Sequence, residues 1–449
     1  MGSESIAQDL AEKVEIFTRG ALLDYKKSIA CRQVKVSGKK GHSRGGFMHS
    51  GDIKILLLEG IHPIAAQTLR SRGFQVDVET TAFSESELMK KVPEYHVLGI
   101  RSKTQITKQV INSSANLWAI GAFCIGTNQI DLEEANHRGV PVFNAPYSNT
   151  RSVAELIIAE LVALSRHLGD RNNEVHQGVW LKSASGAREI RGKTLGIVGY
   201  GHIGSQIIIL AEAIGLRVVY YDIVKKLPLG NSQSMNSLED LLQQADFVTM
   251  HVPETEQTKR MISKAEFSRM KKGSFFLNAS RGSVVVVEDL AEALKTGHLG
   301  GAAVDVYPDE PKNNNEVFYS VLRGLPNMIL TPHIGGSTEE AQEAIGAEVA
   351  ESFTRFLERG STLGAVNFPA VDPGASHGQF VLMNVHRNVP GVLGAINSIV
   401  SKEGMNIRSQ LLSTDSEIGY LVMRLEGANG SAVAAQVARL GTSIKTRYL

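Results

Sequence analysis

The chain has 449 residues, enough for about three domains of ~150 residues each. Its 47 basic residues nearly balance its 46 acidic ones, and 43% of its residues are hydrophobic, so the composition is that of a globular protein with no reason to bind nucleic acid or a membrane. The two cysteines, Cys31 and Cys124, make a disulfide framework unexpected, and the absence of an apolar signal core or a transmembrane-length apolar run predicts a cytoplasmic protein.

Residues 1–50 differ in composition from the rest of the chain. Seven Lys and Arg residues and no acidic residue lie between Asp24 and Asp52. A basic segment rich in Gly and Ser is typical of a partly flexible extension. A phosphate-, RNA- or partner-binding arm over residues 26–44 is the alternative that the sequence leaves open.

Residues 51–148 alternate between strand and helix patterns. Strands are expected at 53–58, 74–78, 95–100, 117–122 and 140–144, and helices at 63–72 and 84–92. This alternation predicts a parallel sheet with right-handed crossovers. A longer helix, 148–168, is expected next, and Ser152 and Glu155 fit a capping box at its start.

A glycine motif opens the following α/β domain. An apolar strand pattern at 194–198 leads into Gly199, Gly201 and Gly204, with the spacing G-x-G-x-x-G. The first glycine permits a tight turn, the second lets the backbone approach a pyrophosphate, and the third lets the helix pack close to the strand. We expect the helix at 205–214, with its free amides facing the phosphates.

An acidic residue supports this interpretation. The next expected strand, 217–221, ends at Asp222, which lies 18 residues after Gly204 (222 − 204), where an acceptor for ribose hydroxyls is expected. A carboxylate at this position repels a 2′-phosphate, so NAD is favoured over NADP, although Lys225 and Lys226 follow closely. Strand, glycines, helix and acid together predict an NAD site.

Residues 149–332 are therefore predicted to form a dinucleotide-binding domain with a six-stranded sheet. Its strands are expected near 194–198, 217–221, 246–252, 274–280, 301–306 and 328–331. Ligands of such sheets bind at the carboxyl ends of the strands. Arg281, Glu310 and His333 all follow strand ends of this sheet, so we expect them to lie near a bound dinucleotide.

These three residue types suit one chemistry. A histidine titrates near working pH and can take the hydroxyl proton of a carbinol while hydride leaves its carbon. A neighbouring carboxylate can hold the other ring nitrogen and raise the histidine pKa. An arginine offers a planar fork to a substrate carboxylate. The set predicts a dehydrogenase of 2-hydroxy acids, with His333 as base, Glu310 as its partner and Arg281 as carboxylate ligand.

The rest of the chain predicts a third domain. Residues 333–360, with a helix at 338–358, are expected to return to the first domain, and 361–378 read as a linker. Residues 379–449 then show strand, helix, strand, strand, helix and strand patterns, at 380–385, 391–401, 406–413, 418–425, 431–440 and 443–448. This order predicts a ferredoxin-like βαββαβ unit, which carries no catalytic cluster and so suggests regulation or assembly.

Several motifs give the chain a family resemblance over about residues 52–449. They are 123–129 (Phe-Cys-Ile-Gly-Thr-Asn-Gln), 144–155, 199–204 (Gly-Tyr-Gly-His-Ile-Gly), 278–282 (Asn-Ala-Ser-Arg-Gly), 331–338 and 366–369 (Val-Asn-Phe-Pro). With them the chain resembles the D-isomer-specific 2-hydroxyacid dehydrogenases that carry a C-terminal ACT domain. The resemblance implies two Rossmann-like domains, NAD as cofactor, no metal, and oxidation of 3-phosphoglycerate to 3-phosphohydroxypyruvate, the first step of serine synthesis. Reduction of 2-oxoglutarate is a further activity of some relatives.

The resemblance also implies roles for single residues. Arg281, Glu310 and His333 are the implied catalytic set. The implied NAD contacts are Gly199, Gly201, His202, Ile203, Gly204, Asp222, Ala279, Ser280, Arg281, Asp305, His333, Ile334, Gly335 and Gly336. The implied substrate residues are Arg101, Ser102, Asn149 and Arg281. Thr80 replaces a lysine of some relatives near the cleft, and Lys182 is a candidate substitute.

For the ACT-like tail the resemblance implies binding of serine between subunits, and hence feedback inhibition and a homo-oligomer, expected to be a tetramer. His386, Asn388 and Asn406 match the serine-contacting positions. Two other functions stay open: another D-2-hydroxyacid dehydrogenase, such as a glyoxylate or hydroxypyruvate reductase, and a non-catalytic protein that senses NAD. The ACT-like tail disfavours the first, and the intact catalytic set disfavours the second.

Overall fold

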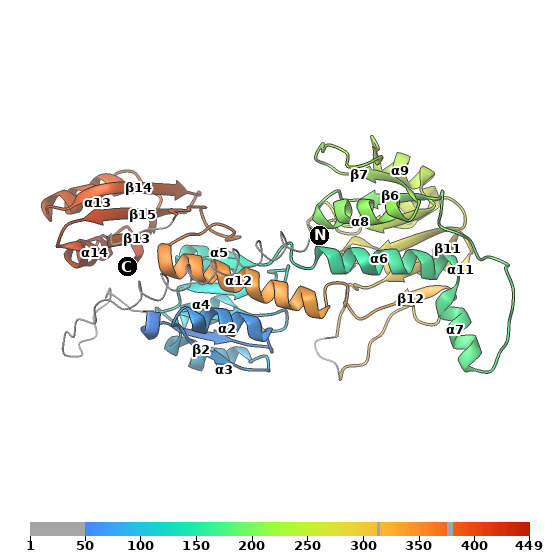
Figure 1. Ribbon diagram of the computed structural model, residues 1–449, viewed down its shortest axis with the longest axis horizontal. Coiled ribbons are helices and arrows are strands. Elements are labelled where there is room, and N and C mark those ends of the chain that lie inside the picture. Colours follow the sequence, from blue (N-terminus) through green and yellow to red (C-terminus); the bar gives the residue numbers. More distant parts are fainter. Residues whose placement is uncertain (1–49, 312–314, 375–379) are drawn as a thin grey trace, which may run out of the picture. The chain divides into compact units, whose positions relative to one another are not determined.

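A computed structural model of the chain describes residues 50–311, 315–374 and 380–449 (Figure 1). The predicted basic extension, except Ser50, and the candidate arm at 26–44 lie outside these residues. Three sheets organise the described chain. Two are parallel and one is antiparallel, so the predicted α/β class is confirmed.

The first sheet has five parallel strands. Their order is β2 (Gln75–Val78), β1 (Lys54–Leu57), β3 (Val97–Ile100), β4 (Ala119–Ala122) and β5 (Val142–Asn144). The helices of this region are α2 (Pro63–Ser71), α3 (Glu85–Lys91), α4 (Lys108–Asn112), α5 (Leu132–His137) and the 21-residue α12 (Glu339–Arg359). The order 2-1-3-4-5 is that of a flavodoxin-like doubly wound sheet.

Helix α12 belongs to the core of this first sheet although it comes some 200 residues later in the sequence. Phe353 of α12 is fully buried and packs edge-on against Phe123 and Phe143, with ring centroids 6.1 Å from each. Gly121 of β4 makes room for it, since a methyl group there would collide with the Phe353 ring. The expected return of residues 338–358 to the first sheet is thus seen as direct packing.

The second sheet has seven parallel strands, one more than predicted. Their order is β12 (Met328–Leu330), β11 (Leu299–Val304), β10 (Ser274–Asn278), β9 (Phe247–Met250), β6 (Thr194–Val198), β7 (Arg217–Tyr221) and β8 (Gln233–Ser234). Its helices are α6 (Thr150–Ser165), α7 (Leu168–His176), α8 (His202–Ala213), α9 (Leu238–Gln244), α10 (Lys264–Arg269) and α11 (Val287–Lys295). The unpredicted strand β8 has only two residues and both are exposed, so it lacks the apolar pattern by which a strand is predicted.

Two helix starts in this region differ from the prediction. Helix α8 begins at His202 rather than at 205, directly after Gly201. Helix α6 begins at Thr150 with Asn149 at its N-cap, so the predicted capping box is wrong: Ser152 instead shares a 2.9 Å hydrogen bond with Thr338. The local pattern predicted that Ser152 caps its own helix, whereas its hydroxyl group is hydrogen-bonded to a residue nearly 190 positions away in the sequence.

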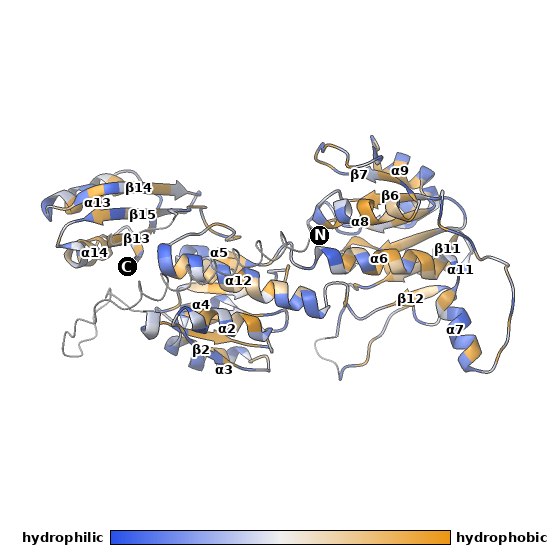
Figure 2. Ribbon diagram, viewed as in Figure 1, coloured by the Kyte–Doolittle hydropathy of each residue, from blue (hydrophilic) through white to orange (hydrophobic). Residues whose placement is uncertain are grey.

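The third sheet is antiparallel, with the order β14 (Asn406–Thr414), β15 (Ile418–Glu426), β13 (Phe380–Arg387) and β16 (Ser443–Tyr448). With α13 (Val392–Lys402) and α14 (Gly430–Ala438) it forms the predicted βαββαβ unit. Figure 2 shows hydrophobic residues concentrated in the strands, and both hydrophobic and hydrophilic residues along α6 and α12. The sheets thus form the cores that amphipathic helices cover.

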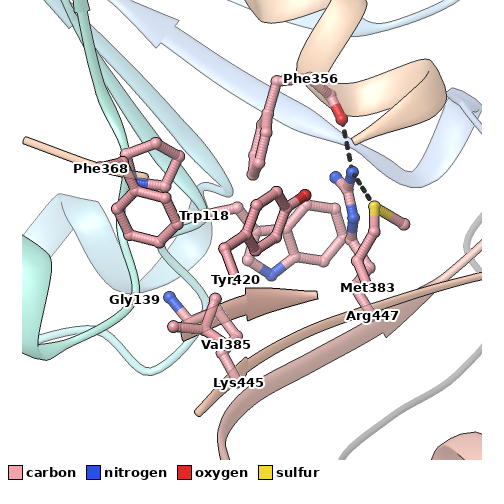
Figure 3. A pocket seen from close by; sticks show the side chains of 10 residues that line it. Trp118, Gly139, Phe356, Phe368, Met383, Val385, Tyr420, Lys445 and Arg447 are labelled. Atoms are coloured by element: carbon pink, nitrogen blue, oxygen red, sulfur yellow. Dashed lines mark hydrogen bonds between the residues drawn. The ribbon is translucent and has the colours of Figure 1, made fainter. Parts of the chain in front are cut away.

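A small pocket lies where strand β16 meets residues just before β4 and β5 and the end of α12 (Figure 3). Arg447 donates to the carbonyl of Phe356 at 2.6 Å and stacks its guanidinium 5.1 Å from the Trp118 ring centroid. Lys445 donates to the carbonyl of Leu117 at 2.6 Å, and burial lowers its pKa to about 7. Tyr420 donates to the carbonyl of Gly360 at 2.7 Å. Two of these acceptors, Phe356 and Gly360, lie at the C-terminal end of α12, whose partial negative charge favours such donors.

Candidate active site

The glycine loop after β6 has the geometry that its spacing predicts. Gly199 has φ 98, and a methyl group there would collide with the carbonyl of His251. A methyl group on Gly204 would collide with the carbonyl of Gly199, whereas Gly201 faces open space. The first and third glycines therefore allow close backbone packing, and the second leaves the start of α8 accessible. The amides of His202 and Ile203 at this helix start suit a pyrophosphate.

Asp222 follows β7 and lies beside the glycine loop. One carboxylate oxygen accepts from the amide of Tyr200 and the other from that of Val224, each at 2.8 Å, and Lys226 forms a 3.2 Å ion pair with it. Burial alone would raise the pKa of Asp222, but these amide and lysine contacts hold it below its ordinary value. The carboxylate therefore stays ionised and can act only as a hydrogen-bond acceptor.

His333 and Glu310 meet at the carboxyl ends of β11 and β12. Nδ1 of His333 lies 2.8 Å from Oε2 of Glu310, and the other carboxylate oxygen accepts from the amide of Tyr307 at 3.1 Å. The hydrogen bond to Glu310 raises the pKa of His333 despite partial burial. Burial is the largest single influence on Glu310 and would raise its pKa, but the hydrogen bond from His333, the charge of that ring, the amide of Tyr307 and the charge of Arg281 together lower that pKa. Because an ionised carboxylate only accepts, Nδ1 carries the proton and Nε2 is left for a substrate.

Asp305 anchors the loop that carries His333. Its carboxylate accepts from the hydroxyl of Thr331 at 2.6 Å and from the amides of Ile334 and Gly335 at 2.8 Å, while its carbonyl accepts from the amide of His333 at 2.8 Å. The residue is only 1% exposed. Its carboxylate thus points into the protein and fixes the loop, a role that the sequence prediction, which grouped it with the NAD contacts, did not include.

Arg281 and its neighbours follow β10. Nη1 of Arg281 donates to the carbonyl of Ser280 at 2.7 Å, while Ser280 is held by Asn278, whose side-chain oxygen accepts from its amide and its hydroxyl. Ala279 lies between them and is half-buried. Gly282, which follows Arg281, packs so closely on the backbone of Tyr307 that a methyl group would not fit. The Arg281 and Glu310 segments therefore touch through their backbones.

Residues of the first sheet border this site. Gly126 lies next to Arg281, since a methyl group on it would be 3.8 Å from Nη2 of that guanidinium. Burial raises the pKa of Cys124, while the charges of Arg101 and Arg281 act to lower it, so both arginines lie near this thiol. Arg101 is half-buried and Ser102 exposed.

Asn149 and Gly336 also approach each other. A methyl group on Gly336 would collide with the Asn149 side chain. Asn149 precedes α6 and Gly336 lies just before the N-cap of α12. Two of the predicted residues, one assigned to substrate and one to NAD, are thus in contact.

Glu59 was not predicted from the sequence and contacts the Arg101 loop. Its carboxylate accepts from the amides of Arg101, Lys103 and Thr104, at 3.1, 3.0 and 2.9 Å. The signal that could have found it is its place directly after the predicted strand 53–58, because polar groups at strand ends of such a sheet face the ligand.

The three residues predicted to contact a serine ligand, His386, Asn388 and Asn406, do not lie together in one chain. His386 is opposite Gly419 in the sheet, and Gly419 is opposite Thr414 of β14. Asn406 stands at the other end of β14, eight residues from Thr414 (414 − 406), or about 27 Å at ~3.4 Å per residue. Asn388, which donates to the carbonyl of Asp415 at 2.7 Å, is at the His386 end.

Within residues 50–311, 315–374 and 380–449, no group of three or more His, Cys, Asp or Glu residues is arranged to hold a metal ion. Over the same ranges, no helix combines the length and the apolar character of a membrane span. Cys124 is a free thiol, and Cys31 lies outside the described residues.

Comparison with known proteins agrees with this geometry. Residues 158–335 match the family model "D-isomer specific 2-hydroxyacid dehydrogenase, NAD binding domain", and residues 382–445 match "AHAS small subunit-like ACT domain". Among solved structures, the D-lactate dehydrogenase of Aquifex aeolicus complexed with NAD and lactic acid is similar, with a TM-score of 0.62, 26% identity, and coverage of 70% of this chain and 100% of that one. The NAD-dependent formate dehydrogenase of Staphylococcus aureus in complex with NAD has a TM-score of 0.58, 29% identity, and coverage of 68% and 96%.

The chain belongs to the D-isomer-specific 2-hydroxyacid dehydrogenases and is an NAD-dependent oxidoreductase with a C-terminal ACT domain. Within this family it is similar to proteins named D-3-phosphoglycerate dehydrogenase. That of Dictyostelium discoideum is 51% identical over 397 residues, covering 88% of this chain and 97% of the relative. That of Escherichia coli K12 is 51% identical over 401 residues, with the same coverage of 88% and 97%.

Proposed function

We propose that the protein catalyses the NAD-dependent oxidation of 3-phosphoglycerate to 3-phosphohydroxypyruvate, the first step of serine synthesis. The names of its relatives support this substrate. The observation that carries the chemistry is the 2.8 Å hydrogen bond between His333 and Glu310 at the carboxyl end of the nucleotide-binding sheet. It pairs a proton acceptor with the acid that stabilises its charged form.

The residues of the second sheet fit NAD. The open space at Gly201, the free amides at the start of α8 and the ionised Asp222 suit a pyrophosphate and a ribose. We assign the remaining contacts to Gly199, His202, Ile203, Gly204, Ala279, Ser280, Ile334, Gly335 and Gly336. Asp305 acts on this set through the loop that it fixes. When bound, NAD supplies the acceptor for the hydride that leaves the carbinol carbon.

The protein groups then handle the proton and the charges. Nε2 of His333 takes the hydroxyl proton, and Glu310 stabilises the resulting imidazolium through Nδ1. Arg281 binds the carboxylate beside the reacting carbon. In the reverse direction the protonated His333 donates to the ketone oxygen. Asp305 keeps the loop in place while the imidazole changes charge.

We assign the distal part of the substrate to Arg101, Ser102 and Asn149. The adjacency of the 101–104 loop, Gly126 and Arg281 supports this assignment. The proposed division of the chain follows from it: residues 51–148 and 333–360 bind substrate, 149–332 bind NAD, and 379–449 regulate, after a linker at 361–378.

We further propose that serine binds the ACT domain and inhibits the enzyme. His386 and Asn388 lie at one end of the third sheet and Asn406 at the other, about 27 Å away by the register at ~3.4 Å per residue. One serine can contact all three only if a second copy supplies Asn406. This supports a homo-oligomer, proposed to be a tetramer, with serine at the interface. A cytoplasmic location is part of the same proposal.

Initial rates of NADH formation test the proposal. Saturable NADH production from 3-phosphoglycerate, with lower rates in millimolar serine, is expected. Faster turnover of glyoxylate or hydroxypyruvate with NADH than of the phosphorylated pair would favour the alternative substrate class. NAD binding without turnover of any 2-hydroxy acid would favour a sensing protein. Reduction of 2-oxoglutarate by NADH, measured in the same assay, tests the further proposed activity.

A further inference from the structure

Glu59 occupies an unusual backbone position at the end of the first strand. Its φ is 62 and that of Gly60 is 60, so two successive residues adopt the left-handed conformation. For a residue with a side chain this conformation is strained, because Cβ approaches the following carbonyl oxygen. Strain of this kind persists where the surrounding structure requires it, often at functional sites. The backbone here is held by hydrogen bonds from Glu59 to Thr81 and from Gly60 to Glu79.

The turn aims the Glu59 carboxylate at the end of the neighbouring strand β3. One oxygen accepts from the amides of Arg101 and Thr104, at 3.1 and 2.9 Å, and the other from that of Lys103 at 3.0 Å. Hydrogen bonds to an ionised group are roughly twice as strong as neutral ones. Three of the four amides of the 101–104 loop thus depend on one side chain.

A second side chain also holds the same loop. Nε2 of Gln129 donates to the carbonyl of Arg101 at 2.7 Å. With both contacts in place, Thr104 is buried while Ser102 and Lys103 are exposed. The loop therefore presents its polar side chains outward in a fixed arrangement next to the segment that borders Arg281.

We propose that Glu59 is a positioning residue for substrate recognition: it fixes the 101–104 loop so that Arg101 and Ser102 meet the anionic end of the substrate remote from the reacting carbon. This inference rests on the proposed function, because it takes 3-phosphoglycerate as the ligand of these side chains. Glu59 does not touch the reacting atoms. Its loss should weaken substrate binding and leave the hydride and proton transfers at His333 intact.

The test is the kinetics of the full-length Glu59→Gln enzyme. The glutamine side chain keeps one accepting oxygen, but its NH2 group replaces the other oxygen. At least one backbone amide of the 101–104 loop then loses its acceptor. The KM for 3-phosphoglycerate is expected to rise at least 10-fold, while kcat changes less than threefold and the KM for NAD is unchanged. Hydrogen–deuterium exchange of the amides at 101, 103 and 104 should become at least 10-fold faster.

Two further variants make the test specific. Glu79→Gln removes an acid of the same region whose carboxylate pairs with Lys91 at 3.3 Å, and it should leave both KM values unchanged. If Glu59 acts through Arg101, then Glu59→Gln should add less than threefold to the KM of Arg101→Ala. If Glu59→Gln fails to fold, Glu59→Asp, with a shorter carboxylate, should still raise the KM for 3-phosphoglycerate above that of the unaltered enzyme.

The outcomes separate the two proposals. An unaltered enzyme that does not oxidise 3-phosphoglycerate refutes the proposed function. An active enzyme whose KM for this substrate is unaffected by Glu59→Gln, or by Glu59→Asp where the first does not fold, refutes only the role of Glu59. Equal losses in kcat and in the KM values for both substrates would also overturn it, because they indicate general structural damage.

Discussion

Replacing Gly282 by alanine should disable the site by moving Glu310. The methyl group would lie 2.0 Å from the carbonyl carbon of Tyr307 and 2.5 Å from the nitrogen of Pro308. Both contacts are to backbone, which cannot rotate away as a flexible side chain can. A tolerable separation of at least 3.0 Å therefore requires the two segments to part by about 1 Å.

This displacement acts on the catalytic pair. The amide of Tyr307 donates to Glu310, and Glu310 lies 2.8 Å from His333. A shift of about 1 Å carried through this segment would stretch that distance to roughly 3.8 Å, beyond hydrogen-bond range. Misplacement by 1 Å can cost about 10²-fold in rate, and overpacking costs about 1–3 kcal/mol of stability. We expect kcat to fall about 100-fold.

The measurements are kcat, NADH affinity by fluorescence and the thermal midpoint. NADH should still bind, because the glycine loop and Asp222, which are proposed to hold its pyrophosphate and ribose, lie on other strands. Gly169→Ala is the matched control: no atom lies within 4 Å of the added methyl group, and alanine in the first turn of α7 should be neutral or stabilising by up to ~1 kcal/mol. A Gly282→Ala enzyme with kcat within threefold of the unaltered value would refute the reasoning.

Three other substitutions test the site and the core. Glu310→Gln removes the carboxylate that raises the pKa of His333, so that pKa falls. Because oxidation needs the neutral imidazole, the acid limb of kcat/KM should move to lower pH, while the maximal rate drops about 10²-fold or more. An unmoved limb in the pH–rate profile would contradict this. Asp305→Asn leaves the amide of either Ile334 or Gly335 facing an NH2 group, since the two amides bond different carboxylate oxygens. The free energy of unfolding should fall by about 1–3 kcal/mol and kcat should drop. Urea denaturation and steady-state rates measure both, and a fully stable, fully active variant would show that the anchor is dispensable. Phe353→Ala empties a fully buried position between two aromatic rings. The free energy of unfolding in urea should fall by about 3–5 kcal/mol. A decrease below about 1 kcal/mol would mean that α12 is not part of the core of the first sheet.

Much of the fold is encoded locally and could be read from the sequence. Apolar strand runs alternating with helix patterns are enough to predict parallel sheets, because buried parallel strands need continuous hydrophobic residues. The glycine spacing and Asp222 are likewise local, since all four residues fall within one βαβ unit of the sequence. Arg281, Glu310 and His333 could be found because strand ends of one sheet meet at one edge.

The tertiary structure decided what depends on residues far apart in the chain. Glu59 gains its three amide partners 42 to 45 residues away, and Ser152 bonds to Thr338 instead of capping its own helix. Asp305 turns its carboxylate inward because the amides that need an acceptor come from the loop after the next strand. No local pattern carries such information, because an unpaired donor or acceptor is satisfied by whichever group the fold brings within reach.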